Sequence, residues 1–272
     1  MRNRIIVAAI FVPLLFIVVF FLPPYIFVGV VSLICAISAY ELLHSIGSKR
    51  NDRVTIYAVF SAALIPIGAY FDITEKVFLA VLLILMFLVF AEAIFVFKKT
   101  KPITLAQILI ALLGGALIPL MMSTLVLMRN MPEGRLIALL PVISAFITDG
   151  GAYFTGIFLG KHKAFPHISP KKTVEGCIGG LAIGALAMVV YGVVLVFSTL
   201  HYIYFWALII YGVVGALFTE LGDLAFSLIK REYDVKDYGR ILPGHGGILD
   251  RFDSMVFAAP AIYLLVTVIP AF

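Results

Sequence analysis

The sequence is dominated by apolar runs of about 20 residues, the length of helix that crosses the hydrocarbon core of a bilayer, separated by short polar breaks. Hydrophobic residues make up 63% of the 272 positions and charged residues only 13%, whereas a soluble domain usually carries about 25% charged residues to cover its surface. This pattern predicts an all-α, polytopic membrane protein and excludes a soluble globular domain.

The polar breaks predict about nine membrane-spanning helices, of which the second and third are short for a full crossing. Two arginines precede the first span, as in a signal peptide, but no small-residue cleavage site follows it, so we expect this span to be retained. The predicted spans are residues 5–21, 25–40, 55–71, 77–97, 105–128, 136–160, 173–200, 203–228 and 252–270.

The distribution of Lys and Arg predicts the orientation of these spans. The N-terminus and the even-numbered loops lie on one side of the membrane, and 17 of the 20 Lys and Arg residues fall there. Only Lys76, Arg129 and Arg135 fall on the other side. Because cytoplasmic loops collect Lys and Arg, we predict a cytoplasmic N-terminus and an external C-terminus. The same bias explains the net charge of +5, which therefore indicates no nucleic-acid partner.

The two halves of the chain differ in the residues they carry. Residues 1–135 contain little beyond apolar spans, apart from Glu92, and are predicted to be N-terminal scaffold helices. Residues 136–272 contain nearly all the unusual residues. They are predicted to be the catalytic membrane helices, with cytoplasmic loops at 161–172 and 229–251.

Several carboxylates lie within the C-terminal spans or at their ends. An ionisable group inside a span costs about 2.5–3.5 kcal/mol on insertion scales, so each is a functional candidate. A spacing of three residues places Glu220 with Asp223, and Asp250 with Asp253, on common helix faces; Asp149 lies in the sixth span. Since Mg²⁺ prefers carboxylate and phosphate oxygens, acids beneath basic loops indicate a metal site beside an anion site.

A simpler interpretation of these acids is ordinary ion pairing. Glu220 and Asp223 precede Lys230 and Arg231 on the same predicted helix, and either acid alone could form a salt bridge there. Five acids from three helices favour the metal site over this alternative.

The loop before the seventh span predicts an anion site. Ser169 and Pro170 are typical of an N-cap and first helical turn, which would place Lys171 and Lys172 in the first turn, just before Thr173. The helix dipole disfavours cations at that end, so two lysines there favour a bound anion. The alternative is topological, because any cytoplasmic loop collects lysines.

The loop before the last span contains the run Pro243-Gly244-His245-Gly246-Gly247. Glycines let backbone N–H groups approach a ligand closely, as in phosphate cradles. The run is neither a Walker A motif nor a dinucleotide fingerprint. Its glycines could equally form a tight turn, and His245 could be a capping residue.

At this loop the sequence resembles the phosphatidate cytidylyltransferases (CDP-diacylglycerol synthases). The run from Ser227 to Asp253 is similar to the signature of that family at every position, through Lys230-Arg231, Lys236-Asp237, Pro243-Gly244-His245-Gly246-Gly247 and Asp250-Arg251-Phe252-Asp253. Further similar blocks are Asp149-Gly150-Gly151, Ser169-Pro170-Lys171-Lys172-Thr173 and Gly222-Asp223-Leu224. The resemblance covers about residues 149–254, and the N-terminal half shares only its membrane spans.

The resemblance implies a membrane nucleotidyltransferase of phospholipid biosynthesis. It would convert CTP and phosphatidic acid into CDP-diacylglycerol and pyrophosphate, with Mg²⁺ as cofactor and room for a second cation. It also implies a homodimer in the cytoplasmic (inner) membrane, with the active site facing the cytoplasm. The lipid phosphate is already ionised at neutral pH, so the reaction requires charge neutralisation and alignment rather than a strong base.

On this resemblance, the candidate residues fall into three groups, and Asp223 and Asp250 belong to two of them. The expected metal ligands are Asp223 and Asp250, with Asp149, Glu220 and Asp253 as additional or outer ligands. The catalytic candidates, which contact phosphates or shape the nucleotide loop, are Asp223, Asp250, Lys230, Arg231, Lys236, Asp237, His245 and Arg251. The substrate-binding candidates are Ser169, Lys171, Lys172, Thr173, Gly244, Gly246 and Gly247.

Two other functions are compatible with buried acids in a membrane protein. A CTP-dependent lipid kinase would transfer the γ-phosphoryl group to a polyprenol or phytol and release CDP, but the intact signature over residues 227–253 argues against it. A proton- or cation-coupled transporter usually binds its ion near the midplane between repeats. Here no repeat is visible, and the acids are biased to the cytoplasmic side.

Overall fold

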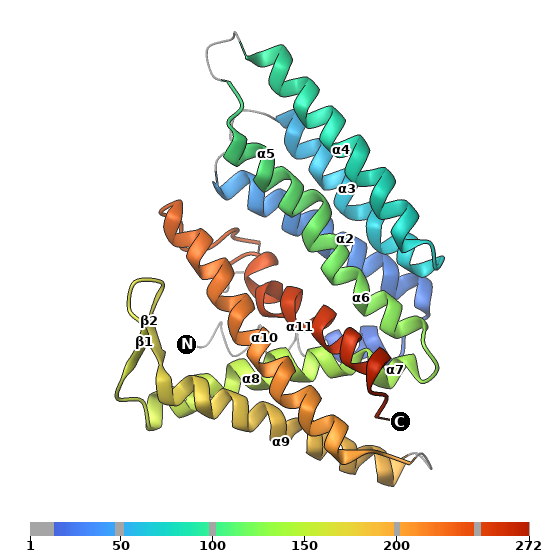
Figure 1. Cartoon of the computed structure of the whole chain (residues 1–272), viewed down its shortest axis with the longest axis vertical. Coiled ribbons are helices and arrows are strands. Elements are labelled where there is room, and N and C mark those ends of the chain that lie inside the picture. Colours follow the sequence, from blue (N-terminus) through green and yellow to red (C-terminus); the bar gives the residue numbers. More distant parts are fainter. Residues whose placement is uncertain (1–13, 47–51, 98–101, 199–201, 242–245, 272) are drawn as a thin grey trace. The chain divides into compact units, whose positions relative to one another are not determined.

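The computed structural model describes residues 14–46, 52–97, 102–198, 202–241 and 246–271. Within these ranges the chain is almost entirely helical, with one short β-hairpin (Figure 1). After a helical stretch at residues 14–20, the helices are α2 (Pro24–Ile46), α3 (Asp52–Tyr70), α4 (Thr74–Val96), α5 (Leu105–Leu112), the π-helix η1 (Leu113–Leu117), α6 (Ile118–Asn130), α7 (Gly134–Ile137), α8 (Leu139–Phe158), α9 (Val174–Ser198), α10 (Phe205–Glu232) and α11 (Leu249–Val268).

The polytopic membrane fold is confirmed. Among the described residues, eight helices are long and apolar enough to cross a membrane, with α5, η1 and α6 acting as one of them. They correspond to the second through ninth predicted spans, while most of the first, residues 5–21, lies outside the described residues. Helix α2 was predicted to end at residue 40 but continues to Ile46. The total number of spans and their orientation stay predictions.

Large apolar side chains on the outside of these helices are those expected of a protein surrounded by lipid. Phe87 and Phe95 of α4 are 72% and 77% exposed. In water such an apolar surface would be unfavourable, whereas in a bilayer the lipid chains surround it.

The described chain divides into two compact units. One comprises Met1–Gly134 and Glu232–Phe252, and the other comprises Arg135–Arg231 and Asp253–Phe272. The boundary near residue 135 separates most of the N-terminal helices from the rest. The segment Glu232–Phe252 returns to the first unit, so α11 begins in one unit and continues in the other.

In the first unit, α3 packs against α2, α4 and α6. Its core is built from fully buried aliphatic side chains that these helices supply: Leu42, Ile65, Leu85 and Ile118. A buried arginine is held at the end of α6, where the guanidinium of Arg129 donates a hydrogen bond to the carbonyl of Leu22 at 3.3 Å.

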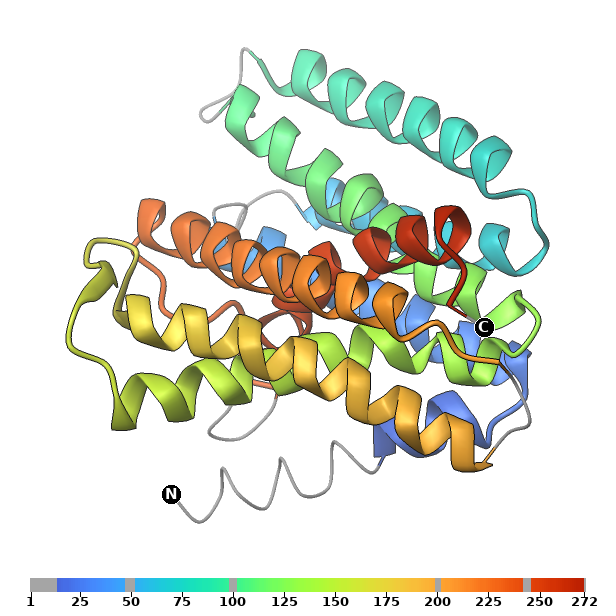
Figure 2. The ribbon, with the colours of Figure 1, turned by 60° about the horizontal axis from the view of Figure 1, so that its bottom comes forward.

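In the second unit, α8 and α9 lie side by side (Figures 1 and 2). Small residues let their backbones approach: a Cβ placed on Gly176 of α9 would lie 3.2 Å from the Cα of Gly156 in α8. The four-residue spacing of Gly176, Gly180 and Gly184 in α9 is typical of close helix packing, and these contacts agree with it.

The predicted span 173–200 begins within one residue of α9, but the N-cap and first turn predicted at Ser169 and Pro170 are wrong. Ser169–Thr173 form strand β2, which pairs antiparallel with β1 (Lys163–Phe165), and α9 begins only at Val174. The residue before a proline is driven towards extended backbone, which suits Ser169 to a strand. The N-cap is instead Thr173, whose Oγ1 accepts a hydrogen bond from the Gly176 N–H at 3.1 Å. Lys171 and Lys172 therefore lie on the strand, before the first helical turn.

Close packing between α9 and α10 gives a testable prediction. A Cβ on Gly212 would lie 2.5 Å from the Cα of Ala185, so Gly212→Ala must displace backbone. We expect it to lower the free energy of unfolding by about 1–3 kcal/mol, measured as thermal unfolding in detergent. Gly29→Ala on α2 is the matched control, because nothing lies within 4 Å of its added Cβ. Equal midpoints for both variants would contradict this packing.

Candidate active site

In the second unit, the ammonium group of Lys172 lies between two carboxylates of α10. Its Nζ is 2.5 Å from Oε2 of Glu220 and 2.7 Å from Oδ2 of Asp223. The spacing of the two acids places both on one face of α10, as predicted, and β2 carries Lys172 to them. The Lys172 side chain is only 17% exposed.

The charge state of Lys172 follows from these contacts. Burial lowers the pKa of its ammonium, but the charges and hydrogen bonds of Asp223 and Glu220 outweigh burial and hold the pKa above its ordinary value. Lys172 therefore remains protonated at neutral pH and balances part of the negative charge on α10.

One oxygen of the Glu220 carboxylate is available for a further partner. Its Oε1 is buried and has no hydrogen-bond partner within the described ranges. Gly180 of α9 lies directly against it, since a Cβ there would lie 3.2 Å from Oε1. A buried, unsatisfied carboxylate oxygen is unfavourable, so this position favours an added donor or cation.

Two further acids of the second unit belong to the same polar cluster. Asp149, in α8, accepts a hydrogen bond from Oγ of Ser254 at 2.8 Å and interacts electrostatically with Asp223 and Asp253. Oδ2 of Asp253 lies 3.7 Å from Nζ of Lys230. Three helices, α8, α10 and α11, thus contribute acids to a cluster that two lysines partly neutralise.

Four of the five expected metal ligands, Asp149, Glu220, Asp223 and Asp253, therefore lie in one unit. In the described part of the chain, no three His, Cys, Asp or Glu side chains form a ready-made metal cluster. Mg²⁺ is usually held in proteins by only one or two carboxylates, with water and substrate phosphates completing its shell. The unpaired oxygen of Glu220 and the 28% exposed side chain of Asp223 fit that mode of binding.

The β-hairpin and the end of α10 carry the other basic candidates of this unit. Lys171 is exposed on β2, beside the part-buried Ser169, while Thr173 caps α9. Arg231 is exposed, and its Nε donates a hydrogen bond to the carbonyl of Ile168 at 3.2 Å, which ties the end of α10 to the hairpin.

Asp250 belongs to the first unit, where it organises the segment before α11. Its Oδ2 accepts hydrogen bonds from the N–H groups of Tyr238 at 2.8 Å and Gly247 at 2.9 Å. Gly246 adopts a φ of 84°, a left-handed conformation that favours glycine. Asp250 therefore ties the backbone at Tyr238 and at Gly247 to the start of α11, and its expected role as a metal ligand stays a prediction.

Sequence analysis missed Glu41, a carboxylate buried in the N-terminal half. Glu41 lies on α2, is 2% exposed, and accepts a hydrogen bond through Oε2 from the N–H of Leu249 at 2.8 Å. Gly239 and Gly247 pack directly against its carboxylate, leaving no room for a Cβ. The predicted span ended at residue 40, one residue before Glu41, so Glu41 fell just outside it; a span ending at Ile46, as α2 does, would have included it.

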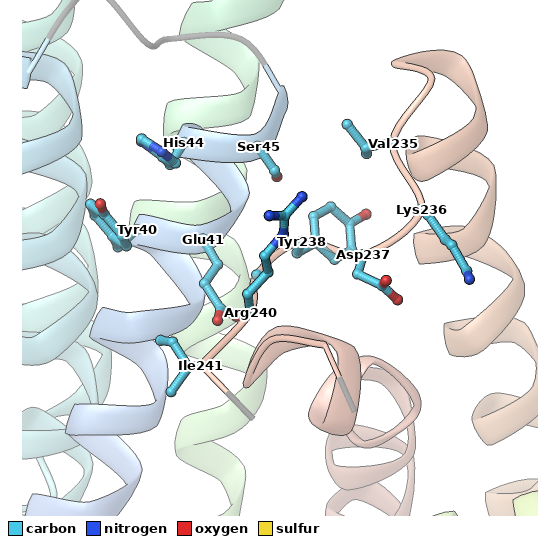
Figure 3. A pocket seen from close by; sticks show the side chains of 11 residues that line it. Tyr40, Glu41, His44, Ser45, Val235, Lys236, Asp237, Tyr238, Arg240 and Ile241 are labelled. Carbon is cyan, nitrogen blue, oxygen red and sulfur yellow. The ribbon is translucent and has the colours of Figure 1, made fainter. Parts of the chain in front are cut away.

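The remaining described candidates, Lys236, Asp237 and Arg251, also belong to the first unit. Lys236 and Asp237 are exposed and line a hollow of about 750 Å³ that also includes residues of α2 (Figure 3). The Nε of Arg251 is buried without a hydrogen-bond partner among described residues. Gly244 and His245 lie outside the described residues.

Comparison with known proteins identifies the family of the chain. A model of the cytidylyltransferase family matches residues 2–269, nearly the whole chain. The chain belongs to the cytidylyltransferase family. A phosphatidate cytidylyltransferase of Bacillus subtilis (strain 168) is 41% identical over 192 residues, which cover 70% of this chain and 67% of that protein.

Relatives from Staphylococcus match over a shorter length. The phosphatidate cytidylyltransferase of Staphylococcus saprophyticus is 47% identical over 133 residues, and that of Staphylococcus haemolyticus is 47% identical over 120 residues. The aligned parts span about half the length of those proteins, 50% and 45% respectively. The family expected from the signature is therefore confirmed.

The shared lysine gives a prediction about stability. Lys172→Met would leave two neighbouring, largely buried carboxylates without their common cation. We expect it to destabilise the protein by about 3 kcal/mol at neutral pH, measured by denaturant or thermal unfolding in detergent. Lys171→Met, on the exposed neighbouring residue, is the control and should have little effect. Equal unfolding of the two variants would show that the salt bridges of Lys172 do not stabilise the fold.

Proposed function

We infer that this chain is a phosphatidate cytidylyltransferase, which converts CTP and phosphatidic acid into CDP-diacylglycerol and pyrophosphate. Membership of the cytidylyltransferase family, together with relatives of that name, carries this conclusion. The polar cluster supports it chemically, since lysines and carboxylates among apolar helices are the groups needed to hold phosphates and their counter-cation in a membrane protein.

The reaction transfers a cytidylyl group and involves no redox change. An oxygen of the lipid phosphate attacks the α-phosphorus of CTP and forms a new P–O bond. The bond between the α-phosphorus and the oxygen that bridges the α- and β-phosphates breaks. The electron pair leaves with pyrophosphate. Because the attacking oxygen is already ionised, the protein must bring two anions together and stabilise the charge that develops between them.

The residues of the second unit are suited to that task. The ammonium groups of Lys172 and Lys230 supply positive charge beside the acids. Asp223 and Glu220 of this unit would hold Mg²⁺, with Asp149 and Asp253 as further ligands. Asp250, the other main ligand that the resemblance implies, stays a separate prediction. When bound, Mg²⁺ would neutralise phosphate charge and polarise the reacting phosphoryl group. Helices α8 and α10 fix the acids in place, so little reorganisation is needed when the substrates bind.

The setting of the enzyme is part of the same proposal. We place it in the cytoplasmic membrane with the basic loops and the active site on the cytoplasmic side, where CTP is present, because Lys and Arg are concentrated in those loops. We also propose that it is a homodimer, as its resemblance to the family implies.

Labelled CTP tests the reaction directly. Purified protein in detergent is incubated with phosphatidic acid, Mg²⁺ and CTP labelled at either the α- or the γ-phosphate. We expect α-label in the lipid and γ-label in pyrophosphate. γ-Label in a lipid acceptor would identify a lipid kinase instead, and no transfer by folded protein would contradict both activities.

A second prediction concerns the metal ligands. Asp223→Asn should raise the Mg²⁺ concentration needed for half-maximal rate and lower activity at limiting Mg²⁺. We expect at least the roughly 10–100-fold loss that changes around metal ligands typically cause. Asp72→Asn is the control, because Asp72 is an exposed turn residue of the first unit. Near-full activity of Asp223→Asn at limiting Mg²⁺ would contradict the assignment.

A further inference from the structure

The hollow of the first unit combines side chains from two distant parts of the sequence. Helix α2 contributes Tyr40, Glu41, His44 and Ser45 from its last two turns, and residues 235–241 form the opposite wall. The volume of about 750 Å³ is within the usual range for small-molecule sites, about 300–1,000 Å³. All its lining residues belong to one unit, so its geometry is defined within that unit.

The α2 wall presents an aromatic surface. The rings of Tyr40 and His44 stack with their centroids 5.3 Å apart and an angle of 14° between their planes. Tyr40 is nevertheless 47% exposed, so the stack has an accessible side. Nucleic-acid bases are commonly bound by stacking on such rings.

The opposite wall is polar and carries two cations. Lys236 and Arg240 are both exposed, with Asp237 between them in sequence. Figure 3 shows the guanidinium of Arg240 extending towards the end of α2, where Ser45 lies. Guanidinium groups bind phosphate oxygens through a pair of parallel hydrogen bonds. The hollow therefore offers groups for both parts of a nucleotide: an aromatic ring surface and cations.

Glu41 fixes the two walls against each other. Its carboxylate accepts the Leu249 N–H at 2.8 Å, while Gly239 and Gly247 of the opposite segment pack against it. The other oxygen, Oε1, is buried without a hydrogen-bond partner in the described chain. Burying a carboxylate costs free energy in desolvation, and a role in holding this segment accounts for its position here.

We propose that this hollow is the binding pocket for CTP, with its pyrimidine base on Tyr40 and His44 and its phosphates held by Arg240 and Lys236. Glu41 is a positioning residue that keeps residues 235–241 and 246–249 against α2. This inference rests on the proposed function and adds to it a role in substrate recognition for the N-terminal half.

The test separates the two substrates. In steady-state assays, Tyr40→Ala and His44→Ala should each raise the KM for CTP by about fivefold or more, the lower limit for loss of a base-stacking contact. The KM for phosphatidic acid and kcat should stay near their original values. Tyr25→Ala is the matched control, an exposed tyrosine at the other end of α2. An unchanged KM for CTP, or a rise only in the KM for phosphatidic acid, would overturn the proposal.

Glu41 is tested by a graded pair of substitutions. Glu41→Ala should raise the KM for CTP, and Glu41→Gln should restore most of the affinity because it keeps an oxygen that can accept the Leu249 N–H. Glu92→Gln is the control: Glu92 is also in the N-terminal half but pairs with Arg53 at 3.5 Å. If Glu41→Ala lowers the unfolding midpoint and leaves the KM for CTP unchanged, its role is structural and the positioning role is wrong.

Direct binding distinguishes failure of this inference from failure of the proposed function. Equilibrium dialysis with labelled CTP and no phosphatidic acid measures nucleotide affinity without turnover. If the original protein binds CTP and Tyr40→Ala binds it at least about fivefold more weakly, the pocket is supported even if no lipid product forms. If both bind CTP equally while the original protein makes CDP-diacylglycerol, the pocket is wrong and the function stands.

Discussion

The salt bridges from Lys172 to Glu220 and Asp223 are the interaction on which the polar part of the second unit depends. Taking a charge out of water costs several kcal/mol unless an opposite charge compensates it. Two acids on one helix face would repel each other and disfavour insertion of α10. Strand β2 of the hairpin before α9 places the ammonium of Lys172 beside both acids. Its positive charge compensates the acidic face of α10.

The same requirement governs the segment before α11, where backbone groups rather than charges need partners. The N–H groups of Tyr238, Gly247 and Leu249 lie in buried positions, and each donates to a carboxylate of Asp250 or Glu41. Charged acceptors form stronger hydrogen bonds than neutral ones. These bonds fix the backbone at Tyr238, Gly247 and Leu249, the described positions on either side of the glycine-rich run.

The sequence predicted the features that depend on local composition and left out those that depend on distant contacts. Apolar length gave eight spans that the structure contains, and three-residue spacing placed Glu220 and Asp223 on one face. The predicted N-cap of α9 was wrong because Ser169-Pro170 is compatible with both a helix cap and a strand, and pairing with β1 decides between them. The contacts of Glu41 with Leu249, more than 200 residues later, have no local signal in the sequence.

These contacts change how the N-terminal half is understood. Its spans carry few charges, which favoured interpreting it as a scaffold, yet Glu41 of α2 holds the segment that contains much of the family signature. The signature itself is divided, since Glu232–Phe252 belongs to the unit of the N-terminal helices and Asp253 to the other. Under the proposed function, a helix that anchors one part of this signature would contribute to catalysis through that anchor, because it holds the segment that carries Lys236, Asp237 and Asp250.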